Sequence, residues 1–167
     1  ALIDETKIQN DLAAIRPECD YLIVSMHWGN EYQTTESSYQ NELAQLLCDG
    51  GADLIIGTHP HVLQPMKWLE GEDGHKTLCA YSLGNFVSNQ HKRATMLGGI
   101  LEVELLFEED GTLKEIASAG VIPTVTHYKK GHYTIYQLAE YTDELAAEHG
   151  MQGYETPFNM TYLAELS

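Results

Sequence analysis

The sequence predicts an α/β fold in which a βαβ unit is followed by antiparallel strands. Short apolar runs at residues 21–26 and 52–56 flank a segment at 36–49 with helical spacing of its leucines. This is the pattern of two parallel strands joined by a right-handed crossover. Beyond residue 62 the pattern changes to strand-like runs separated by turns rich in Gly and Asp.

The elements of the first half follow from local signals. Residues 3–16 predict a helix because apolar residues recur at helical spacing, and Pro17 ends the run. The runs 21–26 and 52–56 are almost wholly apolar, which predicts strands covered on both faces. Gly50 and Gly51 end the intervening helix as a glycine C-cap.

The second half predicts antiparallel strands and then helix. The run from 99 to 107 partly alternates, as a strand with one solvated face does. The last segment, about 134 to 166, contains helical patches, mainly at 136–148. Strands are predicted at residues 62–69, 77–83, 99–107 and 113–122.

The composition excludes several functions. The net charge is −16, from 25 acidic and 9 basic residues, so nucleic acid and anionic lipid would be repelled. The sequence contains no apolar run of about 18 residues, so it predicts no transmembrane helix in this segment. The three cysteines form no C-x-x-C pair, and we expect Cys48 and Cys79 to be small core residues.

The turn from Gly57 to His61 is the first candidate site. His59 and His61 flank Pro60, which favours an extended conformation at His59 and stiffens the pair. Imidazole is the commonest protein ligand for zinc and similar ions. A bare H-x-H is more often two unrelated loop histidines. Its position after a buried parallel strand, where open α/β sheets bind ligands, favours a metal or catalytic role instead.

Other candidates end neighbouring strands. His27 follows the first strand and is expected beside the His59–His61 turn. Glu31 is a candidate fourth ligand or a carboxylate that holds an imidazole N–H, and equally a solvated loop acid. Ser82 and Asn85 could support the metal ligands through hydrogen bonds, or bind an oxyanion or a water, although a purely conformational turn is preferred. The other five histidines are expected to be solvated: His75, His91, His127, His132 and His149.

Three strings together resemble the CapA family of bacterial capsule or poly-γ-glutamate synthesis proteins, which have a calcineurin-like metallophosphoesterase fold. They are MHWGNEY at 26–32, GGADLIIGTHPHVLQP at 50–65 and YSLGNFV at 81–87. The resemblance covers about residues 5–125. It implies a four-layer α/β/β/α sandwich, of which residues 1–125 would form the C-terminal half. Residues 126–167 would be a partly helical C-terminal extension.

The resemblance also implies a site. His27, His59 and His61 match metal-ligand positions for divalent Mn, Zn or Fe, and His59 and His61 would be catalytic. Thr58 stands where the family often has His, which leaves the ligand pair intact. The family's aspartates of a G-D motif and its Asn-His pair are not found. Three imidazoles alone would hold one ion weakly, because a two-metal clamp also needs carboxylates. The expected partner is therefore an N-terminal half of the domain or an oligomeric partner.

The function implied for the complete protein is a metal-dependent, phosphoesterase-type hydrolase of capsule or poly-γ-glutamate synthesis, with the fragment alone inactive. The alternative is a non-catalytic accessory or polymer-binding component with a vestigial metal site. A third alternative is an inert half-domain whose open sheet edge favours association. The resemblance places the protein outside the cell or at its surface, anchored through a segment outside this chain. There it would meet the capsule-polymer machinery.

Overall fold

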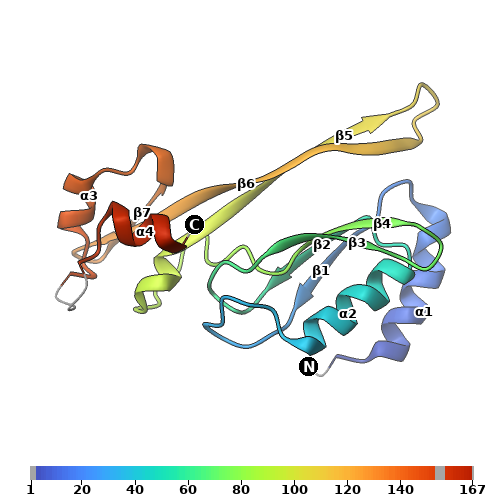
Figure 1. Cartoon of the computed structure of the whole chain (residues 1–167), viewed down its shortest axis with the longest axis horizontal. Coiled ribbons are helices and arrows are strands. Elements are labelled where there is room, and N and C mark those ends of the chain that lie inside the picture. The colour runs from blue at the N-terminus through green and yellow to red at the C-terminus, as the bar shows by residue number, and fades with distance from the viewer. Residues whose placement is uncertain (1–2, 153–156, 167) are drawn as a thin grey trace.

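The computed structural model describes residues 3–152 and 157–166, and it has two sheets and four α-helices in these residues (Figure 1). The elements before residue 81 are α1 (Glu5–Ile15), β1 (Ile23–His27), α2 (Ser38–Asp49), β2 (Leu54–Thr58), β3 (Met66–Glu70) and β4 (Lys76–Ala80). Those after it are β5 (Leu97–Phe107), β6 (Leu113–Lys129), β7 (His132–Gln137), α3 (Asp143–Glu148) and α4 (Met160–Leu166).

The first sheet contains the predicted βαβ unit. Its strand order is β1-β2-β4-β3, with β1, β2 and β4 parallel and β3 antiparallel to β4. Both α1 and α2 lie on the same face of this sheet (Figure 1). The second sheet is the antiparallel order β5-β6-β7. The predicted fold class, a βαβ unit followed by antiparallel strands, is confirmed.

The two long helices begin and end where their sequences predict. The Asp4 side chain caps α1 by accepting a hydrogen bond from the Lys7 amide at 3.0 Å. Ser37 and Gln40 form a capping box at the start of α2, which satisfies two amide groups there. Gly51 adopts a φ of +83° just after α2, so the predicted glycine ending is confirmed.

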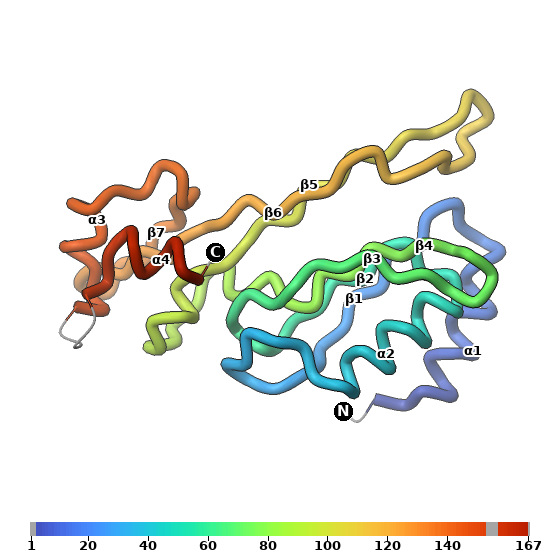
Figure 2. The backbone as a smooth tube through the Cα atoms, in the orientation of Figure 1, coloured from blue at the N-terminus to red at the C-terminus, as the bar shows by residue number. Residues whose placement is uncertain are grey.

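The hairpin β5–β6 extends over the first sheet at one end and reaches α3, β7 and α4 at the other (Figure 2). The strand predicted at 113–122 is longer, because β6 continues through Pro123 to Lys129. Proline is tolerated there because β6 pairs with β5 alone up to this residue, and pairing with β7 begins at Thr124. The helical patch predicted at 136–148 is only partly correct, since β7 continues to Gln137 and α3 begins at Asp143.

Two hydrophobic cores stabilise the chain. The first core lies between the first sheet and its helices, and Cys48 and Cys79 are buried on that side as predicted. The second core lies between the hairpin base and the C-terminal helices, and it includes Met96, Val125 and Phe158. The division at residue 125 stays a prediction, and β6 runs through that position. Within the predicted extension, residues 153–156 lie outside the described residues.

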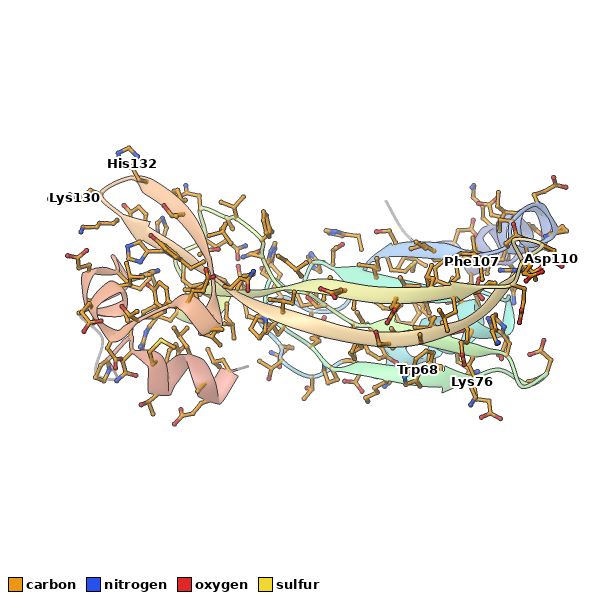
Figure 3. The ribbon with its side chains drawn as sticks, turned by 90° about the horizontal axis from the view of Figure 1, so that it is seen from above. Trp68, Lys76, Phe107, Asp110, Lys130 and His132 are labelled. Atoms are coloured by element: carbon orange, nitrogen blue, oxygen red, sulfur yellow. The ribbon has the colours of Figure 1, made fainter. Side chains whose placement is uncertain are left out.

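The prediction that β1 is covered on both faces is wrong. Ile23 is 53% exposed, and Ser25 and His27 on the same face are also exposed. The reason is that both helices cover the opposite face. The hairpin passes over the open face but leaves a groove of about 710 Å³, lined by Ile23 and Ile56 below and by Leu101 and Val103 above. Figure 3 shows the hairpin running above the sheet to its tip at Phe107 and Asp110.

Two of the five histidines expected to be solvated are buried. His127 and His149 are 5% and 2% exposed and pack against each other in the second core. His75 is partly buried and its Nε2 lies 3.0 Å from the Ala52 carbonyl oxygen, whereas His91 and His132 are exposed. None of the helices in the described parts of the chain is long and apolar enough to cross a membrane.

Candidate metal centre

The predicted site residues meet at the carboxyl ends of β1 and β2. These strands are parallel and in register, with His27 opposite Thr58. Beyond the strand ends the two loops remain connected by backbone hydrogen bonds. The Trp28 amide donates to the Thr58 carbonyl at 3.1 Å, and the Tyr32 amide donates to the Pro60 carbonyl at 2.8 Å. The loop that carries Glu31 is therefore held against the His59–His61 turn.

Gly57 allows the core to approach the strand end closely. A Cβ at this position would lie 2.0 Å from the Tyr81 carbonyl oxygen and 2.4 Å from Trp28 Nε1. Trp28 Nε1 itself donates to that same carbonyl at 3.0 Å, and Trp28 is only 3% exposed. Trp28 thus lies in the first core beneath the site.

The site has unusual backbone geometry. In the described residues, only four non-glycine residues have positive φ, and three of them are Tyr32 at 67°, His59 at 100° and His61 at 62°. Such conformations cost about 1–3 kcal/mol each and tend to occur at functional sites. The prediction that His59 is extended is therefore wrong. The hydrogen bonds to the β1 loop require the turn to fold back, and this requirement overrides the preference imposed by Pro60.

Glu31, His59 and His61 form the tightest group of ligand-type side chains. One ligand atom from each lies within 4.8 Å of the others. Glu31 Oε1 is 3.8 Å from His61 Nε2, and both side chains remain partly exposed. The His27 ring lies beside His59, with ring centroids 4.6 Å apart, but His27 is not a member of this group.

Hydrogen bonds fix the tautomers of two imidazoles. Asn85 donates through Nδ2 to the Gln90 side chain and the Thr95 carbonyl, so its Oδ1 faces His61 Nδ1 at 3.0 Å. His61 therefore donates from Nδ1 and keeps a lone pair on Nε2, the atom near Glu31. Asn85 therefore occupies a position that supports a candidate ligand, which is one of the roles considered for it in the sequence analysis.

His27 is oriented in the same way by Thr58. The Thr58 hydroxyl donates its proton to the Met26 carbonyl at 3.0 Å, and its oxygen is 3.3 Å from His27 Nδ1. The His27 Nδ1–H must then donate to Thr58, which leaves Nε2 free to bind a cation. Sequence reasoning did not assign this role to Thr58, although its place at a strand end beside His59 was a usable signal.

Ser82 does not join the group. It is 2% exposed, and its hydroxyl oxygen accepts a hydrogen bond from the Gly84 amide at 3.2 Å, which closes the turn after β4. This is the conformational role that the sequence favoured. Tyr32 and Lys92 were not predicted, yet they lie beside the site: the Tyr32 ring stacks on His61, and Lys92 lies over Tyr32.

The donor set fits a divalent transition ion. Imidazole nitrogen with a free lone pair, together with one carboxylate oxygen, is the chemistry that Mn, Zn and Fe ions bind. The hydrogen bonds from Asn85 and Thr58 provide the outer support that metal-binding histidines need. This set could hold one ion; a second ion would need further carboxylates.

The fold and these side chains are consistent with a fragment of a metallophosphoesterase-like α/β domain that has a histidine-rich site at its strand ends. The family of bacterial capsule synthesis proteins PGA_cap matches residues 2–90, and the chain belongs to this family. It is 36% identical over 101 residues to the PGA biosynthesis protein CapA of Bacillus subtilis (strain 168), and 39% identical over 94 residues to the capsule biosynthesis protein CapA of Bacillus anthracis. These matches cover 60% and 56% of this chain but only 25% and 21% of the relatives.

Proposed function

We propose that this chain carries part of the active site of a metal-dependent, phosphoesterase-type hydrolase that acts in the synthesis of bacterial capsule polymer, with poly-γ-glutamate as the polymer. The observation that carries the proposal is the grouping of Glu31, His59 and His61 within 4.8 Å at the carboxyl ends of two parallel strands. Family membership supports the capsule assignment. The name of the Bacillus subtilis relative, a PGA biosynthesis protein, supports the choice of polymer.

In this proposal His59, His61 and Glu31 hold a divalent ion. Such an ion acts as a Lewis acid on a phosphoryl oxygen and lowers the pKa of bound water. His61 is oriented for this role by Asn85. His27, beside His59, either adds a fourth donor or gives a proton to the leaving oxygen. A partner would complete the site with carboxylates, either the N-terminal half of the domain or a second subunit.

The proposal includes a location outside the cell or at its surface, with an anchor in a segment outside this chain. At that location the protein would meet the machinery that makes the capsule polymer. The family match supports this location, because capsule polymer lies on the cell surface.

The test is metal binding and turnover in the full-length protein. Calorimetry with Mn²⁺ and with Zn²⁺ should show binding that His59→Ala or His61→Ala abolishes. His132→Ala, at an exposed histidine of β7, should have no effect. Unchanged Mn²⁺ and Zn²⁺ affinity in His59→Ala would refute a metal site at this turn.

A second candidate is a non-catalytic accessory or polymer-binding component with a vestigial metal site. One observation favours it: Glu31 is the single carboxylate in the ligand group formed by the described residues. A phosphodiesterase assay on the full-length protein with Mn²⁺ separates the two candidates. Robust turnover that disappears in His61→Ala would exclude the accessory role.

A further inference from the structure

A basic tripeptide lies next to the candidate metal centre. His91, Lys92 and Arg93 belong to the segment between β4 and β5, in a chain with 25 acidic and only 9 basic residues. Lys92 Nζ lies 3.3 Å from the centroid of the Tyr32 ring, and the Tyr32 ring stacks on His61 with centroids 6.1 Å apart. Lys92 is thus separated from a candidate ligand by a single aromatic ring.

A chain of hydrogen bonds also fixes Lys92 relative to His61. Asn85 Oδ1 contacts His61 Nδ1 at 3.0 Å, and Asn85 Nδ2 donates to the Thr95 carbonyl at 3.3 Å. The Thr95 hydroxyl in turn donates to the Lys92 carbonyl at 2.6 Å. The backbone that carries Lys92 is therefore connected to the site by a route independent of Tyr32.

The same segment is fastened to the second core. The Thr126 hydroxyl donates to the Phe86 carbonyl at 3.2 Å, and the Arg93 guanidinium lies 4.0 Å from the Tyr162 ring centroid. The two adjacent cations therefore have different surroundings. Arg93 packs on the aromatic side chains of the C-terminal lobe, whereas Lys92 extends toward the candidate metal centre.

Lys92 forms no ion pair with a carboxylate in the described part of the chain. Among the described residues, ion pairs with carboxylates are seen at Lys7, Arg16, Lys67, Lys114 and Lys129, and Lys92 is not in this set. Lys92 Nζ lies over the face of the Tyr32 ring, an aromatic surface that attracts a cation without neutralising its charge. A lysine held on a neutral ring face still has N–H donors available to an anion.

We propose that Lys92 binds a phosphoryl oxyanion of the substrate beside the candidate metal centre, with Tyr32 holding the ammonium group in place. This inference rests on the proposed function, because it assigns a second contact for the same substrate. A compact ammonium suits phosphate, which it meets as a point charge. A local cation is needed here because a net charge of −16 otherwise repels anionic substrates.

The test measures phosphate binding in the full-length protein. Inorganic phosphate is titrated calorimetrically with and without Mn²⁺, and Mn²⁺ is titrated alone. Lys92→Gln should weaken phosphate binding about tenfold or more, because the variant loses a charge-assisted hydrogen bond to the anion. The Mn²⁺ affinity should stay within about twofold, because Lys92 donates no ligand atom. Lys92→Arg should retain part of the phosphate affinity. Lys130→Gln, at the far end of the molecule in Figure 3, is the matched control and should change neither.

Each outcome decides the proposal. Equal phosphate affinity in the unsubstituted protein and Lys92→Gln, or no phosphate binding in either condition, overturns it. Equal weakening of phosphate and Mn²⁺ binding also overturns it, because Lys92 would then only support the fold. If the protein binds no Mn²⁺, the proposed function fails. Phosphate binding that depends on Lys92 without Mn²⁺ would still uphold the anion site.

Discussion

At the scale of single residues, the candidate centre depends on which imidazole nitrogens carry protons. The Thr58 hydroxyl has one proton, and it donates this proton to the Met26 carbonyl. Its oxygen can then only accept from His27 Nδ1, which leaves Nε2 of His27 free. Asn85 does the same for His61. In both cases a hydrogen-bond acceptor holds the proton on Nδ1, so that the Nε2 lone pairs of His27 and His61 are available to a cation.

Thr58→Val should weaken Mn²⁺ or Zn²⁺ binding about tenfold, the lower end of what the loss of an outer hydrogen bond to a metal ligand costs. Calorimetry on the full-length protein measures the change. Thr58→Ser keeps the hydroxyl and should bind nearly normally, and Thr134→Val on β7 is a distant control on an exposed position. If Thr58→Val bound metal as well as Thr58→Ser, the hydroxyl would have no orienting role.

Residue spacing was enough to predict that His27, Glu31, His59 and His61 would meet, since they follow adjacent parallel strands. It could not predict the role of Thr58, and it left several roles open for Asn85, because these roles depend on which hydrogen-bond partners each side chain has in the folded protein. It could not predict Lys92 either. Lys92 lies in the segment between β4 and β5, which is hydrogen-bonded to β6 of the second core, and its position beside Tyr32 depends on tertiary structure.

At the scale of elements, the C-terminal helices pack around a buried histidine pair. Burial lowers the pKa of both His127 and His149 from the usual 6.5, and Lys129 further lowers that of His127. The Thr126 carbonyl partly opposes the effect at His149 by accepting its Nε2–H at 3.0 Å. Around the pair, His127 Nδ1 contacts the Tyr141 hydroxyl at 2.6 Å, and the Met151 amide donates to His149 Nδ1 at 3.0 Å.

The sign of the pH effect follows from linkage. Above pH 6.5 both histidines are neutral in the folded and unfolded chain, so the full stability of this lobe is present. As the pH falls below 6.5, the two histidines bind protons in the unfolded chain but not yet in the folded lobe. The free energy of unfolding therefore decreases with falling pH until the pH reaches the lowered pKa values of the folded state. Each tenfold loss of proton affinity costs about 1.4 kcal/mol.

Hydrogen exchange measured by mass spectrometry between pH 8 and pH 5 should therefore show the second core opening on acidification, after correction for the intrinsic exchange rate. The first core, between the parallel sheet and its helices, serves as the internal reference. His149→Gln should reduce the pH dependence, whereas His132→Gln at an exposed position should not. Equal protection of the second core at pH 8 and pH 5 would contradict the prediction.

Among the elements, the βαβ unit was predictable because its signals are local: apolar runs, a capping box at Ser37 and glycines after α2. The sequence does not predict β7, although Tyr133, Thr134 and Ile135 favour a strand, because the apolar spacing that follows them is helical. The length of β6 could not be read from the sequence. It depends on β7 starting to pair only after Pro123.

At the scale of the whole molecule, two layers face each other without filling the space between them. The open face of the first sheet presents Ile23 at 53% exposure, and the hairpin above it presents Leu101, Val103 and Leu105 to the groove. The groove between these layers has a volume of about 710 Å³. β1 is also an edge strand on its outer side, with backbone groups available for pairing. Exposed apolar surface and an open edge of this kind favour association.

The 167-residue chain on its own should therefore associate at micromolar concentration, and Ile23→Lys with Val103→Lys should shift it toward the monomer. The reason is that association buries apolar surface, at roughly 25 cal/mol per Å², while lysines would have to be desolvated. Sedimentation velocity over a concentration series measures the mass. Phe107→Lys, at the hairpin tip away from the groove, is the matched control and should change the mass little, although Phe107 is 51% exposed. A chain that sediments as a monomer at every concentration would show that the open layers do not drive association.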